Sequence, residues 1–108
     1  MRKEKKMITV FVLDGCPYCE RAIKALHAEK ARSKVGFGVV SVNRTPDLRE
    51  KLRLRTGVSS FPSVWFGGVY IGGLESGPDP FGGLLRVLET GSWSKARAHE
   101  AYHNPIIR

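Results

Sequence analysis

The sequence predicts a mixed α/β domain in which helices flank a four-stranded sheet, and three observations support this fold class. An apolar strand, a helix and a second strand follow one another between residues 8 and 42, which is a βαβ unit with parallel strands. Two short β-rich runs flank Gly67-Gly68, which is typical of an antiparallel hairpin. The length of 108 residues and the hydrophobic content of 42% suit one domain with its own core. The expected order of elements is βαβαββα.

The first strand is expected at residues 8–13, a continuous apolar and β-branched run that ends at Asp14-Gly15. Pro17 is expected to begin the next helix, because its missing N–H would be unpaired in the first turn. An apolar stripe at helical spacing continues this helix to about Lys30. Residues 35–42 are expected to form the second strand.

The second helix is expected to follow Thr45, which suits the N-cap, with Pro46 and Asp47 in its first turn. Leu48, Leu52 and the stem of Arg55 form one face of this helix, and Gly57 is expected to end it as a left-handed cap.

The hairpin strands are expected at residues 63–66 and 69–71, joined by a two-residue turn that glycines permit. A last helix is expected to begin at Asp79-Pro80, to carry four apolar residues and to stop at Gly91.

The chain is expected to divide into three parts: a basic N-terminal extension at residues 1–6, a folded domain at residues 7–91 and an extension at residues 92–108 without a clear period. The apolar run after the basic start is too short for a signal peptide or a membrane span. We therefore expect a soluble cytoplasmic monomer without a membrane partner, in a compartment where thiols stay reduced.

The net charge of +8 comes from 18 basic and 10 acidic side chains that are scattered along the chain. Solvated surface charge is the simplest interpretation, and attraction to an acidic protein or an anionic thiol is the next. Nucleic-acid binding would predict an affinity that falls steeply with salt. Because the sequence contains no recognisable nucleic-acid motif, we expect no such partner.

Cys16 and Cys19 are the only cysteines, and a disulfide between them would close too small a loop to add much stability. A thiolate is the species that attacks a disulfide, and Cys16 is expected where a strand ends and a helix begins, a setting that favours negative charge. Cys19 falls on the same helical face, so it can resolve a mixed disulfide formed at Cys16. Pro17 restrains the turn, and Tyr18 places a phenol ring beside the nucleophile.

Two other interpretations of the cysteine pair remain open, namely half of a zinc site and two buried cysteines without a redox role. Zinc would need two further ligands from His27, His99 and His103. We expect no metal, and the Asp14-Gly15 pair ahead of Cys16 indicates an exposed loop.

The motif Cys16-Pro17-Tyr18-Cys19 after an apolar strand resembles the dithiol motif of the glutaredoxin family. Ser60-Phe61-Pro62 resembles the family's Thr-Val-Pro stretch, whose proline is cis and lies against the dithiol. Residues 67–73 resemble the family's hairpin and the Gly-Gly that follows it. The three motifs occur in family order over residues 7–91, and the order and length of the elements match the thioredoxin fold.

This resemblance implies a glutathione-linked thiol–disulfide oxidoreductase of cell redox homeostasis that reduces protein or low-molecular-weight disulfides through attack by Cys16 and resolution by Cys19. It implies glutathione as co-substrate and no bound cofactor. By position, the residues expected to contact glutathione are Tyr18, Phe61, Pro62, Gly73, Leu74 and Glu75, with Ser76 next. A cis bond before Pro62 would turn the Phe61 backbone toward an added peptide strand, whereas an ordinary trans proline is the alternative.

The chain departs from the family pattern at both ends of this groove. Leu13 stands where glutaredoxins carry Lys or Arg, and Leu74-Glu75-Ser76 replaces a small residue and two aspartates. The basic residues of the second helix are candidates for the missing cation, and these are Arg49, Lys51, Arg53 and Arg55. One alternative is therefore an electron donor re-reduced by a thioredoxin-reductase-type flavoenzyme, as in the ribonucleotide-reductase partners of this fold. Another is an iron–sulfur carrier, which the proline after Cys16 is thought to disfavour in the family.

Overall fold

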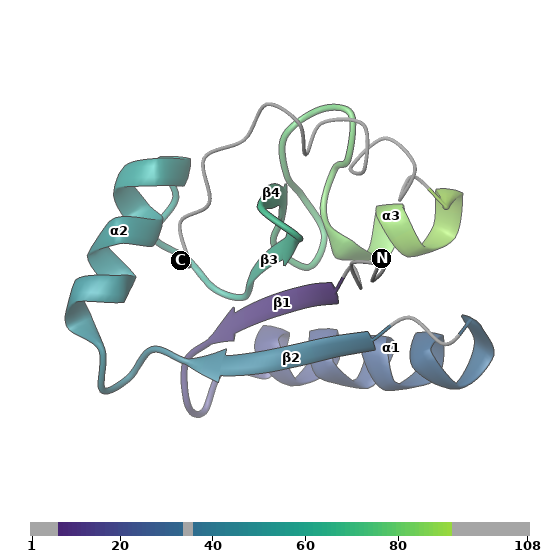
Figure 1. Ribbon diagram of the computed structural model, residues 1–108, viewed down its shortest axis with the longest axis horizontal. Coiled ribbons are helices and arrows are strands. Elements are labelled where there is room, and N and C mark those ends of the chain that lie inside the picture. Colours follow the sequence, from purple (N-terminus) through teal and green to yellow (C-terminus); the bar gives the residue numbers. More distant parts are fainter. Residues whose placement is uncertain (1–6, 34–35, 92–108) are drawn as a thin grey trace, which may run out of the picture.

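The computed structural model describes residues 7–33 and 36–91, so the two predicted extensions at residues 1–6 and 92–108 lie outside the described part. Its four strands form one sheet in the order β2-β1-β3-β4 (Figure 1). The elements in chain order are β1 (Met7–Val12), α1 (Pro17–Ser33), β2 (Gly36–Ser41), α2 (Pro46–Thr56), β3 (Ser63–Phe66), β4 (Val69–Gly72) and α3 (Leu84–Thr90). This order confirms the predicted mixed α/β fold.

Strand β1 lies inside the sheet and joins its two halves. It pairs in parallel with β2, with Val10 opposite Val39, and antiparallel with β3, where Val10 faces Val64. Strands β3 and β4 form the predicted antiparallel hairpin, and Gly67 takes the positive φ of 61° that its tight turn requires. The βαβ unit and the hairpin therefore share one central strand.

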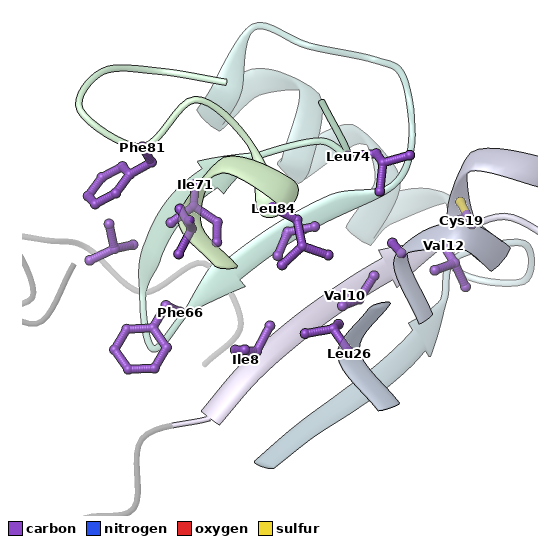
Figure 2. Close-up of a cluster of buried hydrophobic side chains, with 14 residues drawn as sticks. Ile8, Val10, Val12, Cys19, Leu26, Phe66, Ile71, Leu74, Phe81 and Leu84 are labelled. Carbon is purple, nitrogen blue, oxygen red and sulfur yellow. The ribbon is translucent and has the colours of Figure 1, made fainter. Parts of the chain in front are cut away.

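Alternate residues of the central strands pack on opposite faces of the sheet. On one face, α1 and α3 cover a large apolar cluster that includes Ile8, Val10, Leu26 and Leu84 (Figure 2). On the other face, α2 covers a smaller cluster formed by Phe11, Val42, Leu52 and Trp65. Helix α2 accordingly stands apart from α1 and α3 in Figure 1.

The second helix begins and ends where the sequence predicted, but its start is not capped as expected. Thr45 occupies the N-cap position, yet its side chain makes no capping hydrogen bond. Gly57 takes the left-handed conformation at φ 75°, and its N–H donates to the Arg53 carbonyl. The predicted C-terminal cap is therefore confirmed, and the side-chain cap at Thr45 is wrong.

The last helix begins later than predicted, at Leu84 instead of Asp79. Gly82 and Gly83 have φ values of 75° and 96°, which a right-handed helix cannot continue through. The segment after β4 instead folds back on the strand: Gly83 N–H donates to the Ile71 carbonyl at 2.9 Å, and Leu84 N–H donates to the Gly73 carbonyl at 2.8 Å. Helix α3 still ends at Gly91, as expected.

Candidate functional site

Cys16 lies in the loop between β1 and α1, and Cys19 lies in the first turn of α1. The Cys19 backbone N–H donates a hydrogen bond to Cys16 Sγ at 3.2 Å. Before the pair, Gly15 has a positive φ of 74°, and the Asp14 N–H donates to Asn43 Oδ1 at 2.7 Å. The loop thus holds the half-buried Cys16 sulfur against the helix N-terminus, where backbone N–H groups stabilise negative charge.

Cys19 occupies a different environment, since only 2% of it is exposed. It lies at one end of the apolar cluster under α1, in the same region as Val12 (Figure 2). Burial, followed by the hydrogen bond with Cys16, raises the pKa of the Cys19 thiol to about 12. At neutral pH Cys19 therefore remains a protonated thiol.

The Phe61–Pro62 peptide bond is cis, as the family resemblance implied, and the trans alternative is wrong. The Cys16 Sγ lies 3.7 Å from the Phe61 carbonyl oxygen, within reach of a weak S–H donor. Within the described residues, the Phe61 N–H makes no hydrogen bond. An unpaired N–H next to a reactive sulfur can donate a hydrogen bond to a main-chain carbonyl of an extended peptide.

Tyr18 is 54% exposed, so its ring is available beside Cys16. The Arg21 guanidinium lies 5.7 Å from the centre of this ring and 3.5 Å from Glu75 Oε2. Arg21 therefore links α1 to the loop after β4. Arg21 was not foreseen as a site residue, although its position three residues after Tyr18 places both on one helical face.

Gly73, Leu74 and Glu75, the expected groove residues after β4, differ in burial and in contacts. The Leu74 side chain is 4% exposed and packs in the core, so a ligand could meet only its backbone. The Glu75 carboxylate is exposed and already faces Arg21. Gly73 lies close to Pro62, because a Cβ on Gly73 would lie 3.3 Å from the Pro62 carbonyl oxygen. The structure thus brings Gly73 to the cis proline, while the Leu74 side chain turns away.

The four basic residues of α2 are not equivalent. The Arg49 guanidinium lies 5.7 Å from the centre of the ring of Phe61, the residue whose carbonyl oxygen faces Cys16 Sγ. Arg53 is engaged with Glu50 by hydrogen bonds of 3.0 and 2.6 Å, and this contact lowers the pKa of the Glu50 carboxyl. Arg55 lines a cavity beside Pro62. Among the described residues, no contact ties Lys51 to Phe61 or to this cavity.

A cavity of about 420 Å³ lies beside the cis proline. Its walls come from the end of α2, the segment before β3, strand β4 and the loop that follows it. Its lining includes Arg55, Ser60, Pro62, Tyr70, Gly73 and Ser76. This cavity was not foreseen from the sequence, because its lining residues are far apart along the chain.

The zinc interpretation gains no support from the described residues. His27 is exposed and stacks edge-on against Phe37, with ring centres 5.0 Å apart. His99 and His103 lie outside the described residues. Within residues 7–33 and 36–91, no group of three or more His, Cys, Asp or Glu side chains is placed to hold a metal ion. None of the described helices combines the length and hydrophobicity needed to cross a bilayer.

Comparison with known proteins points to one family. The family model described as Glutaredoxin matches residues 8–71. The chain is similar to a glutaredoxin of Pseudomonas aeruginosa, with 29% identity over 68 residues, which are 63% of this chain and 76% of that protein. It is also similar to glutaredoxin 4 of Pasteurella multocida, with 33% identity over 61 residues, which are 56% of this chain and 52% of that protein.

Solved structures give the same result. The solution structure of a glutaredoxin from Brucella melitensis aligns with a TM-score of 0.50 and 26% identity, over 90% of this chain and 88% of the other. The crystal structure of a buckwheat glutaredoxin–glutathione complex aligns with a TM-score of 0.53 and 23% identity, over 86% of this chain and 74% of the other. The second match is too distant in sequence to show more than a shared fold.

Proposed function

This chain belongs to the glutaredoxin family, and we propose that it is a glutathione-linked thiol–disulfide oxidoreductase that reduces protein or low-molecular-weight disulfides. The family and the close pair of cysteines support a thiol oxidoreductase. The observation that carries the finer proposal is the inequality of the pair: Cys16 is half-buried at a helix N-terminus, and Cys19 is a buried thiol. We place this activity in the cytoplasm, where both thiols would stay reduced.

The first step is attack by the Cys16 thiolate on one sulfur of the substrate disulfide. A bond forms between Cys16 Sγ and that sulfur, the substrate S–S bond breaks, and the other substrate sulfur leaves as a thiolate that takes a proton from water. The Cys19 N–H at 3.2 Å stabilises the attacking thiolate before the step. Pro62 follows Phe61, whose carbonyl oxygen lies 3.7 Å from the attacking sulfur, and Tyr18 precedes Cys19, whose N–H donates to it.

In the second step Cys19 attacks Cys16 Sγ of the mixed disulfide. The substrate leaves as its second thiol, and a Cys16–Cys19 disulfide forms, so two electrons have passed to the substrate. In the mixed disulfide Cys16 carries no charge, and its sulfur no longer accepts a strong hydrogen bond from the Cys19 thiol. Two of the causes that raise the pKa of Cys19 are then removed, and Cys19 loses its proton more easily at the moment when it must attack.

Two molecules of glutathione then restore the dithiol and leave as one glutathione disulfide, which balances the cycle. We propose that the glutathione main chain pairs with Phe61 and reaches Gly73, Leu74 and Glu75 at one end. At the other end, Arg49 beside the Phe61 ring supplies the cation that Leu13 does not.

Reduction of hydroxyethyl disulfide, coupled to glutathione and glutathione reductase, tests this donor directly. We expect turnover in this assay and little turnover when glutathione is replaced by a thioredoxin-reductase system. The opposite result would establish the second candidate, a donor re-reduced by a flavoenzyme. Leu13 and the Arg21–Glu75 pair favour that candidate, because both alter the groove in which glutathione would lie.

Two variants separate the roles of the cysteines. Cys16→Ser should abolish reduction of every disulfide. Cys19→Ser should block protein disulfides that need resolution, while glutathione mixed disulfides are still reduced by glutathione itself. Full activity of Cys19→Ser on protein disulfides, measured by free-thiol release, would contradict the resolving role.

A further inference from the structure

We propose that the cavity beside Pro62 is a specificity subsite that receives an acidic side chain of a polypeptide disulfide while Cys16 attacks the disulfide. This inference rests on the proposed function and names the class of protein substrate that the site favours. It concerns residues that the dithiol chemistry itself does not use, above all Arg55 and Tyr70.

The cavity lies close to the attacking sulfur. Cys16 Sγ lies 3.7 Å from the Phe61 carbonyl oxygen, and the next residue, Pro62, is a wall of the cavity. The Phe61 N–H has no partner among the described residues. A peptide that pairs with it runs along this segment, and its side chains point alternately to either side. A residue a short distance from the substrate cysteine therefore reaches the cavity. A volume of about 420 Å³ lies within the range of small-ligand sites, about 300–1,000 Å³.

The charge at the cavity wall favours an acidic side chain. Among the described residues that line the cavity, Arg55 is the only charged one, and none carries a carboxylate. Arg55 has no ion-pair partner within the described chain, in contrast to Arg53, which pairs with Glu50. Two acids flank the lining loop in sequence. Glu75 faces Arg21 on α1, and Asp79, which follows the lining residue Pro78, is not itself among the lining residues. The guanidinium of an arginine at the cavity wall is a planar fork of donors that fits a carboxylate.

The cavity lining also contains side chains with neutral hydrogen-bond donors. Tyr70 is half-buried, and burial raises the pKa of its phenol above the ordinary value. The phenol therefore keeps its proton at neutral pH and can donate it to a carboxylate oxygen. Ser60 and Ser76 also line the cavity, and each carries a hydroxyl that can donate a hydrogen bond. A carboxylate would meet donors on several sides, whereas an ammonium group would meet Arg55.

The test uses peptide disulfides in which a single glutamate is moved through the positions on either side of the cysteine, each matched by a glutamine peptide. The reduced protein is mixed with each peptide, samples are quenched in acid, and the second-order rate constant of peptide reduction is measured. No glutathione is needed, so the result does not depend on the electron donor. We expect one position at which glutamate reacts about five- to tenfold faster than glutamine.

Arg55→Gln should remove this preference, and Arg55→Glu should reverse it toward a lysine peptide. Lys51→Gln is the matched control, because it removes one positive charge from the same helix without touching the cavity. It should keep the preference. Raising the salt concentration should weaken the preference, because Arg55 is exposed.

Equal rates for glutamate and glutamine at every position would overturn the subsite while the redox function stands. A preference that survives in Arg55→Gln would also overturn it. If Arg55→Gln slowed glutathione-coupled reduction of hydroxyethyl disulfide as much as peptide reduction, the cavity would serve a carboxylate of glutathione, which contradicts the proposal. If no peptide disulfide reacted at all, the proposed function and the subsite would fail together.

Discussion

Cys16 and Cys19 lie three residues apart but in different environments, and this difference makes Cys16 the attacking and Cys19 the resolving thiol in the proposed reaction. Cys16 receives an N–H from Cys19 and faces the loop, whereas the Cys19 side chain packs with the core (Figure 2). Spacing alone placed both on one helical face. How far each sulfur is buried depends on which residues pack against α1, and this packing is set by the tertiary structure.

Alkylation of the reduced protein at pH 7 should mark Cys16 alone. The pKa of Cys19, raised to about 12, leaves almost no thiolate there, and burial also blocks the reagent. Peptide mapping by mass spectrometry after brief exposure to iodoacetamide measures the two sites separately. The protein unfolded in urea is the control, in which both cysteines should react, and equal labelling of the folded protein would refute the asymmetry.

Leu13→Lys should raise glutathione-coupled kcat/KM by about two- to fivefold, because a new exposed cation attracts a carboxylate of glutathione. Leu13 also packs against the cluster under α2, so Leu13→Met serves as the uncharged control of similar size. The gain should shrink as salt is added. Equal activity of the two variants would show that the missing cation is not limiting.

At the scale of elements, the loop between β4 and α3 is the part that the sequence described least well. Its backbone packs so closely against β4 that side chains are excluded. A Cβ on Gly83 would lie 2.6 Å from the Ser76 backbone nitrogen, and one on Gly72 would lie 2.5 Å from the Ser76 carbonyl oxygen. This packing holds Gly73 against Pro62, so the loop contributes to the wall of the site.

Gly83→Ala should therefore destabilise the protein by more than Gly57→Ala. Both glycines have positive φ, which costs an alanine about 1–2 kcal/mol. A Cβ at position 57 would meet open space, whereas a Cβ at position 83 would clash with backbone atoms, which costs about 1–3 kcal/mol more. Urea unfolding of the two variants gives the comparison, and equal losses would show that the loop can move aside.

At the scale of the whole molecule, β1 belongs to both apolar clusters. Its residues Ile8 and Val10 face α1 and α3, while Phe11 faces α2. Helix α2 carries Arg49 toward Phe61 and Arg55 into the cavity wall, whereas the dithiol belongs to the α1 side. The site therefore combines elements from both faces of the sheet, and its geometry depends on their common strand.

Leu52→Ala should lower the free energy of unfolding by about 2–4 kcal/mol, because Leu52 is 2% exposed at the centre of the α2 cluster. Leu54→Ala on the same helix is the control, since Leu54 is 68% exposed and should change stability by less than about 0.5 kcal/mol. Because the clusters share β1, circular dichroism and tryptophan fluorescence should report one transition for Leu52→Ala. Separate transitions would mean that α2 unfolds independently.

The sequence by itself determined the order of elements, the mixed sheet and the motif that contains Cys16 and Cys19. These features follow from local patterns: apolar periodicity, proline and glycine at element ends, and the spacing of two thiols. It also located the end of α2 at Gly57, because a left-handed cap is a local property of the chain.

Only the tertiary structure decided the features that join residues distant in the chain. It selected Arg49 and Arg55 from four basic candidates, buried the Leu74 side chain, paired Arg21 with Glu75 and formed the cavity beside Pro62. It also delayed α3 to Leu84, because the loop before it is held against β4. Contacts of this kind depend on how helices and loops pack across the sheet, and no local pattern specifies that packing.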